Sequence, residues 1–471
     1  MAIIPIFSKI LERVVFKQII KYLSENKLLH PNHHSYRKHH NTTTALIQMY
    51  DTWVQAVDGG ELSGVCLLDM SAAFDIVDHG LLLQKLKLYG FEDCVLDWIW
   101  SYLSDRQQCV SIDSCLSGML KTDSGVPQGS ILGPILYILF TNELPDIVQE
   151  HLGEGLDAAG HVQQGGEHDG LPGFTIACTE CGTICCYADD TTYSTSSKDP
   201  QQLTERLSSK YLVVAEFMLN NRLKLNDEKT HLMVMATSQY RRKNTDLSVE
   251  IRTPTEVISP TKTEKLLGAL VNQDLKWAEH ILLGEDALVK GLAKRLGALK
   301  QVCKVASFKN RKMVAEGLIM SKLSYLIPVW AGCESYLLHA LQGIQNKAAR
   351  FVTRSDLSTA GHLGQCGWLS VRQLAMYQTC ILVYKVLEEK SPMYLYRMFN
   401  RDYIKNTRQA ARLELRQDGE TPELGLAMNS FRWRALRDYN QIPADMRKLE
   451  TLKSFKNCLW KWIIDHIPIN A

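Results

Sequence analysis

Two adjacent aspartates, Asp189 and Asp190, lie where an apolar segment gives way to a polar one. The segment before them, Thr183–Tyr187, is mostly apolar, and the segment after them, Thr191–Ser196, is rich in threonine and serine. This pattern predicts a strand, a tight turn that carries both acids, and a second strand. Neighbouring carboxylates repel each other, so a fold that keeps them together usually supplies cations there. Taken alone, the pattern also fits an ordinary surface turn.

A third aspartate, Asp69, follows the apolar run Gly64-Val65-Cys66-Leu67-Leu68. A continuous apolar run predicts a strand buried on both faces, and α/β proteins often place their chemistry at the end of such a strand. Two strand-borne carboxylate sites that converge can hold two divalent ions about 3.5–4 Å apart. Oxygen ligands of this kind suit Mg²⁺. An acid that is merely solvated at a strand end is the alternative.

Other elements follow from periodicity and from Gly/Pro punctuation. Ser71 is placed to cap a helix whose first turns hold Phe74, Asp75, Val77 and Asp78. The loop Ser124–Ser130 contains two glycines, which permit close approach to a ligand, and it leads into a helix from Ile131. We also expect helices over residues 6–25, from Thr42, 81–89, 95–103 and 201–219, strands over 231–235 and 265–270, and hairpins over 109–122 and 239–262.

Long helices are predicted from Ala287 onward, and they are locally basic. Residues 287–313 contain eight Lys or Arg residues and no acid, although the whole chain has a formal net charge of only +2. A locally basic helical region is typical of a surface that binds phosphate backbones, and a solvated basic face is the alternative. The candidate binding residues are Lys294, Arg295 and, on a further helix over residues 335–355, Lys347.

Cysteines gather at the end of a glycine-rich stretch. Seven glycines lie between Gly153 and Gly173, so residues 149–177 are predicted to be a flexible insertion. It is followed by Cys178, Cys181, Cys185 and Cys186, whose spacing could hold zinc, with reduced structural cysteines as the alternative.

The thirteen cysteines are an odd number, and no secretory leader is evident, so we expect an intracellular protein of the cytoplasm or nucleus rather than a secreted one. The longest apolar run, Ile131–Phe140, is too short for a membrane span, which needs about 20 residues. We therefore expect no membrane partner.

Together these motifs resemble the reverse transcriptases of non-LTR (LINE-type), jockey-like retrotransposons. The segment Leu67–His79 resembles the first palm motif of that family, and Tyr187-Ala188-Asp189-Asp190 resembles its metal-binding hairpin. Their order along the chain makes the resemblance specific. The other matching segments are Ser124–Pro134 (template-contacting loop and helix), Leu225–Thr230 (the motif after the hairpin), Leu266-Leu267-Gly268 (primer grip), and Phe7–Arg13 with Tyr36–Thr44 (finger segments).

The resemblance implies an α+β fold of the right-hand polymerase class. It places partial fingers at residues 1–50, an antiparallel-sheet palm at 51–280, a helical thumb at 281–360 and a helical C-terminal extension at 361–471. The implied activity is that of an RNA-directed DNA polymerase, a nucleotidyltransferase that extends a DNA primer along an RNA template with dNTPs. Its implied cofactors are two Mg²⁺ ions, for which Mn²⁺ can substitute.

The resemblance also implies roles for single residues. Asp69, Asp189 and Asp190 would be the catalytic metal ligands, together with the backbone carbonyl of Met70, and Lys229 would donate a proton to pyrophosphate. The nucleotide-binding residues would be Phe74, beneath the sugar, with Gln128 and Gly129; the template and primer would meet Arg37 and the basic residues Lys294, Arg295 and Lys347.

Departures from the family pattern leave a second reading open. Members usually carry an Arg-Pro-Ile element before the finger helix, whereas this chain begins at Met1-Ala2-Ile3-Ile4-Pro5. It therefore resembles a copy truncated at its N-terminus, or a mispredicted gene model, with an intact palm. The alternative function is a catalytically defective remnant that binds nucleic acid. A third class, a two-metal nuclease, would leave the Ser124–Ser130 loop and Phe74 without a role.

Overall fold

The computed structural model describes residues 4–70, 72–113, 115–150, 183–243, 248–253, 256–399 and 425–469. They fall into two compact units. The first draws on Met1–Lys38, Leu62–Val234 and Asn244–Pro260, and the second on His39–Glu61, Met235–Lys243 and Thr261–Ala471. None of the described helices is long and apolar enough to cross a lipid bilayer.

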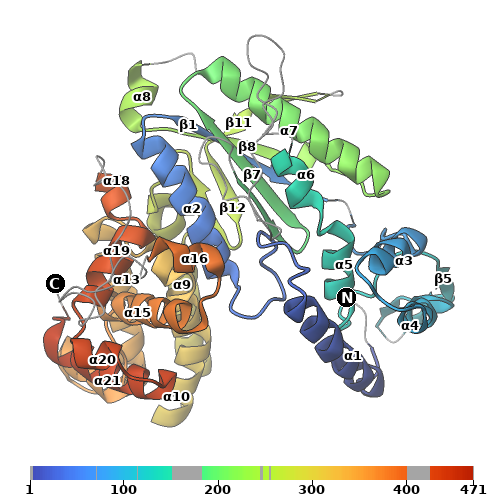
Figure 1. Cartoon of the computed structure of the whole chain (residues 1–471). Helices are drawn as coiled ribbons and strands as arrows, with labels where there is room; N and C mark the ends of the chain where they lie inside the picture. The colour runs from blue at the N-terminus through green and yellow to red at the C-terminus, as the bar shows by residue number, and fades with distance from the viewer. Residues whose placement is uncertain are drawn as a thin grey trace. The chain divides into compact units, whose positions relative to one another are not determined.

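A five-stranded sheet forms the centre of the first unit (Figure 1). Its strand order is β11-β8-β1-β7-β6, and β7 pairs antiparallel with both of its neighbours. The strands are β1 (Leu62–Leu68), β6 (Thr183–Tyr187), β7 (Asp190–Ser197), β8 (His231–Met235) and β11 (Pro260–Thr261). The apolar runs thus form strands where the sequence predicts them.

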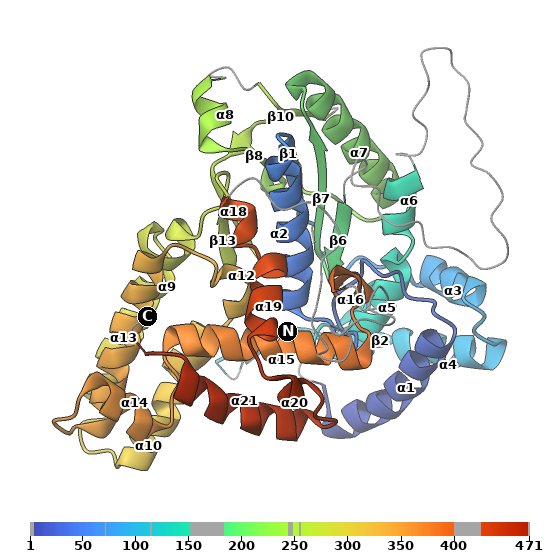
Figure 2. The ribbon, with the colours of Figure 1, turned by 60° about the vertical axis from the view of Figure 1, so that its left-hand side comes forward.

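Helices cover this sheet. The long helix α7 (Pro200–Asn220) packs against β1 and β7, and Figure 2 shows it running along β7. Gly64 makes the close approach possible, because a Cβ there would lie 2.6 Å from a Leu207 methyl carbon. Helix α5 (Gly133–Thr141) is buried on all sides, which suits its almost entirely apolar sequence, and α6 (Leu144–Glu150) follows it.

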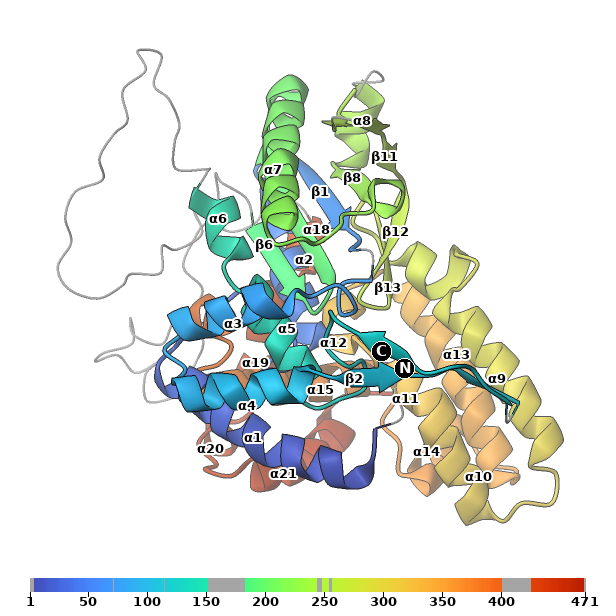
Figure 3. The same ribbon diagram turned by 90° about the vertical axis from the view of Figure 1, so that its right-hand side faces the viewer.

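The rest of the first unit consists of helices and small hairpins. Helices α3 (His79–Leu88) and α4 (Asp93–Leu103) lie side by side, as Figure 3 shows. The remaining elements are α1 (Ile6–Glu25), β2 (Arg106–Gln108), β3 (Ser111–Ile112), β4 (Cys115–Leu116), β5 (Leu120–Thr122), η1 (Asp227–Lys229), β9 (Ile251–Arg252) and β10 (Val257–Ile258).

The second unit is mainly helical. It contains the hairpin β12 (Thr263–Leu266) and β13 (Ala269–Asn272), and helices, most of which bury apolar side chains. Those helices are α2 (Thr42–Asp58), α8 (Ser238–Lys243), η2 (Glu279–Leu283), α9 (Leu288–Val302), α10 (Phe308–Ala315), η3 (Glu316–Met320), α11 (Ser321–Ser324), α12 (Ile327–Trp330), α13 (Ser335–Thr353), α14 (Thr359–Cys366), α15 (Val371–Glu389), α16 (Met393–Met398), α18 (Gly425–Met428), α19 (Phe431–Asn440), α20 (Ala444–Arg447) and α21 (Leu452–His466). The predicted α+β fold with an antiparallel sheet and a helical C-terminal region is confirmed.

Three local predictions are wrong. Residues 265–270 do not form one strand: the chain reverses at Leu267 and Gly268, which have positive φ, so these residues end β12 and begin β13. Ser71 lies outside the described residues, but the expected helix is not present in the residues after it: 72–75 form a turn, and α3 begins at His79, where the Asp78 side chain accepts a hydrogen bond from the Leu81 amide. Residues 239–262 do not form a single hairpin either, since Arg241, Arg242 and Lys243 belong to helix α8 and only the later residues pair as β9 and β10.

One buried carboxylate joins α1 to the start of α5. Glu12 is only 2% exposed, and its Oε2 accepts hydrogen bonds from the amides of Ile131 (2.5 Å) and Leu132 (3.2 Å). These amides lie at the N-terminal end of α5, where backbone donors have no partner within the helix and a negative charge is favourable. Glu12 thus fixes the C-terminal end of the loop Ser124–Ser130, through the two amides that follow it.

We expect Glu12→Ala to lower the free energy of unfolding of the first unit by about 2–4 kcal/mol, because it leaves two buried amides without a partner. Denaturant unfolding followed by a probe in the first unit measures this. Glu25→Ala, which removes an exposed acid from the same helix, is the control and should change the stability by no more than about 0.5 kcal/mol. Equal effects of the two changes would contradict the role of Glu12.

Candidate active site

The pairing of β1 with β7 brings the predicted acids together. The ladder runs from Leu62↔Ser197 to Leu68↔Thr191, so Asp69 and Asp190 are the next residues at the same end. Asp189 precedes Asp190 in the turn between β6 and β7. The pKa of Asp190 is raised above its ordinary value. Desolvation is the larger cause, and the negative charges of Asp189 and Asp69 add to it. The charges of Asp189 and Asp69 therefore act on the Asp190 carboxylate.

The turn that carries the acids is held from outside the hairpin. Ala188 has a φ of 58°, a conformation that alanine rarely adopts, and its amide donates a 2.9 Å hydrogen bond to the Ser35 hydroxyl. The chain just before Ser35 runs along β6, where the His34 amide donates to the Cys186 carbonyl. Next to Ser35, desolvation and then the charge of Asp189 raise the pKa of Tyr36. The segment around Ser35 thus braces the acidic turn.

A further segment lies beside Asp69. The Asn226 amide donates to the Asp69 carbonyl at 3.0 Å, and Met70 forms an isolated antiparallel bridge with Leu225. Lys229, on the short helix η1, places its Nζ 3.9 Å from Asp69 Oδ2. Both side chains of this ion pair are exposed, so the pair contributes little to stability. The ammonium group is accessible for the same reason. The structure therefore places Lys229 beside Asp69, and its role as a proton donor stays a prediction.

Two aromatic rings pack together next to Met70, the residue that follows Asp69. Phe74 stacks on Tyr137 with ring centroids 4.6 Å apart, and the Tyr137 hydroxyl donates to the Met70 sulfur at 3.0 Å. Burial, and then the charge of Asp189, raise the pKa of Tyr137 far above its ordinary value, so this phenol stays protonated. Tyr137 is buried and Phe74 half-buried, so the buried ring supports the partly exposed one.

The loop Ser124–Ser130 is fastened to the residues that follow Phe74. The Val126 amide donates to the Phe74 carbonyl at 2.7 Å, and Gly125 both donates to the Val77 carbonyl and has a φ of 83°. A Cβ at Gly125 would lie 2.5 Å from the Asp75 carbonyl oxygen, so only glycine fits. Gln128 is exposed, and its Nε2 lies 3.4 Å from a carboxylate oxygen of Asp75. Gln128 and Gly129 therefore lie on a loop of fixed shape.

The acidic cluster fits a divalent cation that also binds a substrate. Within the described ranges, no group of three or more His, Cys, Asp or Glu side chains is arranged so that it could hold a metal ion unaided. Mg²⁺ seldom uses such a group, since it is commonly held by one or two carboxylates together with waters and substrate phosphates. Desolvation, and then the negative charges of Asp189 and Asp69, raise the pKa of Asp190, and a cation would neutralise the negative charge that gathers here. The donor set of Asp69, Asp189 and Asp190 therefore suits Mg²⁺.

The cysteines are a poor match for zinc. Cys178 and Cys181 lie outside the described residues. Cys185 and Cys186 are successive residues of β6, so their side chains point to opposite faces of the sheet. Burial raises the pKa of the Cys185 thiol far above its ordinary value and that of Cys186 to about 12, whereas a zinc ligand must be a thiolate. The structure thus gives these two buried thiols a packing role.

The predicted template-binding residues differ in their surroundings. Arg37 is half-buried, and its Nη1 donates to the carbonyls of His30 (2.6 Å) and His33 (3.0 Å), so it also fixes the loop before Ser35. Lys294 and Arg295 are exposed on α9. A contact of any of the three with nucleic acid stays a prediction.

Lys347 shares a cavity with two cations that the sequence did not assign to a site. The cavity, of about 290 Å³, is lined by Lys300, Lys347, Arg350 and Phe351 from α9 and α13. The three cationic side chains are exposed and converge on one space, as a phosphate-binding surface requires. Lys300 and Arg350 stand on different helices, so only the folded chain reveals their convergence.

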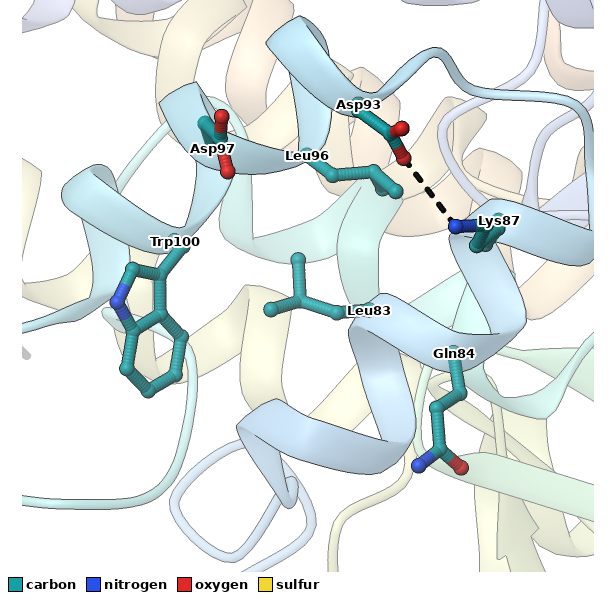
Figure 4. A pocket seen from close by; sticks show the side chains of 7 residues that line it. All are labelled: Leu83, Gln84, Lys87, Asp93, Leu96, Asp97 and Trp100. Carbon is teal, nitrogen blue, oxygen red and sulfur yellow. Dashed lines mark hydrogen bonds and ion pairs between the residues drawn. The ribbon is translucent and has the colours of Figure 1, made fainter.

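Another cavity, of about 310 Å³, lies between α3 and α4 in the first unit (Figure 4). Its lining combines the apolar side chains of Leu83, Leu96 and Trp100 with an ion pair between Lys87 and Asp93. It contains none of the residues predicted for catalysis.

Residues 1–270 match a family model described as reverse transcriptase (RNA-dependent DNA polymerase). Among curated proteins, the "Probable RNA-directed DNA polymerase from transposon X-element" of Drosophila melanogaster is 23% identical over 359 residues, which cover 75% of this chain and 35% of that protein. The "RNA-directed DNA polymerase from mobile element jockey" of Drosophila funebris is 24% identical over 352 residues, with the same coverages. The chain thus matches 35% of the length of these relatives.

Among solved structures, telomerase from Candida tropicalis in complex with a TWJ fragment of telomeric RNA superposes with a TM-score of 0.41 at 13% identity, covering 95% of this chain and 56% of that one. The apo form of that telomerase gives the same TM-score at 12% identity, covering 82% of this chain and 60% of that one.

We expect Asp190→Asn to raise the thermal midpoint of the protein at neutral pH in the absence of divalent cations. The raised pKa means that Asp190 favours folding only when it is protonated, and this contribution is lost as the pH rises through that pKa. Millimolar Mg²⁺ should stabilise the unaltered protein more than the variant, because the variant lacks one ligand. Thermal unfolding with and without Mg²⁺ measures both effects.

Asp97→Asn, which removes an exposed acid from α4, is the matched control and should leave the gain from Mg²⁺ unchanged. An equal gain from Mg²⁺ in the unaltered protein and in Asp190→Asn would contradict a cation site at these acids.

Proposed function

The chain belongs to the reverse transcriptase (RNA-dependent DNA polymerase) family, and we propose that it is the polymerase part of a non-LTR retrotransposon protein, which extends a DNA primer along an RNA template with dNTPs. The observation that carries this proposal is the β1–β7 register, which sets Asp69 beside Asp190 and next to Asp189. The fold class is the right-hand polymerase class predicted from the sequence. The boundaries of fingers, palm, thumb and C-terminal extension, at residues 50, 280 and 360, stay proposals.

In the proposed reaction, Asp69, Asp189, Asp190 and the Met70 carbonyl hold the cations. The chemistry that bound Mg²⁺, or Mn²⁺ as its substitute, supplies is activation of the primer 3′-hydroxyl and neutralisation of the departing pyrophosphate. Lys229 stands beside Asp69 and donates a proton to the pyrophosphate as a general acid.

The remaining groups position the incoming nucleotide. Phe74 lies under its sugar and excludes a 2′-hydroxyl, and the stack on buried Tyr137 keeps the Phe74 ring from moving aside. Gln128 and Gly129 contact the template and the nucleotide from a loop that Glu12 and Asp75 hold in place. Arg37 contributes to the template side chiefly by fixing the loop that braces the acidic turn.

We expect the unaltered protein to extend a DNA primer annealed to RNA in the presence of Mg²⁺ or Mn²⁺, and Asp189→Ala to lose this activity to background, because the change removes a metal ligand. Asp97→Ala removes an exposed acid of the same unit and should retain the activity. Primer extension resolved on a gel measures all three. Extension absent from the unaltered protein with both cations would reject the polymerase, and would favour the alternative of a remnant that only binds nucleic acid.

Nucleic-acid binding by the second unit is a separate proposal, supported by the cavity of Lys300, Lys347 and Arg350. Binding of an RNA–DNA duplex should weaken linearly with the logarithm of the salt concentration. We expect the double change Lys347→Ala and Arg350→Ala to lower the magnitude of that slope by about 1–2, since each phosphate contact contributes nearly one. Fluorescence anisotropy over a range of salt concentrations measures the slope.

Lys453→Ala, on the exposed face of α21, is the control for this experiment, because it removes a cation from the same unit away from the cavity. A slope that is unchanged by the double change, or lowered equally by the control, would place the nucleic acid elsewhere.

The setting we propose is intracellular. The eleven cysteines of the described ranges are all free thiols, which is compatible with a reducing compartment.

A further inference from the structure

The hairpin of β12 and β13 has a strained turn (Figure 3). Leu266 pairs with Ala269, so the turn consists of only Leu267 and Gly268, with φ values of 47° and 82°. Two-residue turns with positive φ at both positions strongly prefer Asn-Gly or Gly-Gly. A leucine there costs about 1–2 kcal/mol relative to glycine, so contacts from outside the hairpin must hold this conformation.

Tyr325 supplies those contacts. Its hydroxyl donates a 2.8 Å hydrogen bond to the Leu267 carbonyl oxygen, and its ring lies over the other turn residue, Gly268. A Cβ at Gly268 would lie only 3.1 Å from Tyr325 Cε1, so the ring and the glycine are fitted to each other. One side chain thus contacts both residues of the turn.

Tyr325 is itself held firmly. Its carbonyl accepts a 2.9 Å hydrogen bond from the indole nitrogen of Trp330, which is completely buried. Its hydroxyl lies 3.2 Å from the Thr42 hydroxyl, at the first residue of α2. A phenol can donate one hydrogen bond and accept another, so Tyr325 can satisfy Leu267 and Thr42 together. Three segments that are remote in sequence therefore meet at one hydroxyl.

The turn at which they meet is accessible. Gly268 is exposed and Leu267 half-exposed, while Leu266 and Ala269 on either side are buried. Strained backbone that its surroundings hold in place is characteristic of functional sites. A ligand that binds across this turn would find the Leu267–Gly268 backbone already in one conformation, and would not bear the entropy cost of ordering it.

We propose that Tyr325 is a positioning residue whose hydroxyl holds the Leu267–Gly268 turn in the conformation that contacts the primer strand. This inference rests on the proposed polymerase function, since the turn corresponds to the segment that resembles a primer grip. Tyr325 does not touch the reacting atoms. Its effect therefore falls on the primer and on the mobility of the turn, and leaves dNTP binding unchanged.

The minimal test is Tyr325→Phe, which removes only the hydroxyl. Loss of one hydrogen bond of about 1 kcal/mol corresponds to a factor of about five. We expect amide hydrogen exchange at Leu267–Ala269 to quicken about fivefold and the KM for primer to rise by a similar factor, with the KM for dNTP unchanged. Thr42→Val, which removes the second hydroxyl of the junction, should produce a smaller change in the same direction.

Two further variants make the test specific. Tyr336→Phe removes the hydroxyl of an exposed tyrosine on α13 and should change neither exchange nor KM. Asparagine tolerates positive φ, so in a Leu267→Asn background the turn needs less external support. Tyr325→Phe should therefore quicken exchange less in that background than in the unaltered chain.

The outcomes separate this inference from the proposed function. Unchanged exchange at the turn in Tyr325→Phe overturns the positioning role, whatever the activity. If Tyr325→Phe quickens amide exchange at the turn but the unaltered protein extends no primer, Tyr325 positions the turn and the polymerase function is rejected. Quicker exchange with an unchanged KM for primer, in an active enzyme, overturns the assignment of the turn to the primer.

Discussion

The register between β1 and β7 is the constraint on which the candidate site depends. Seven consecutive residue pairs fix it, and they set Asp69 opposite Asp190 although the two side chains repel each other. A slip by one residue would turn every side chain of β1 to the other face and would put a side chain where only Gly64 leaves room for Leu207. The burial of the sheet therefore maintains a cluster of like charge that the acids could not maintain themselves.

Around this ladder, segments from distant parts of the chain fix the conformation of the turns and loops near the acids. Ser35 fixes the turn before Asp189, Asn226 holds the end of β1, and Glu12 anchors the residues that follow the Ser124–Ser130 loop. Each contact is a hydrogen bond made to a backbone group. The geometry near the acids is thus set mainly by main-chain interactions, and the side chains that we propose for chemistry stay accessible.

The sequence predicts those features whose signal is local. Apolar runs mark β1 and β6, the change to threonine and serine marks the acidic turn, and helical periodicity marks α1, α7 and α13. It fails where a cap cannot be recognised from sequence alone: the helix expected soon after β1 begins only at His79, after the Asp78 cap. It also misses roles that need distant partners, such as those of Glu12, Tyr137 and Tyr325, and the convergence of Lys300 with Arg350.

Because backbone pairing holds the acids in place, catalysis and folding make separate demands on this chain. A copy in which one of the three aspartates has mutated would keep its ladder and its core, and the relief of charge repulsion would favour its folded state. Cellular quality control detects unfolding, so it would not remove such a copy. Inactive descendants would therefore persist as folded proteins, and only selection for the proposed polymerase activity could preserve the aspartates.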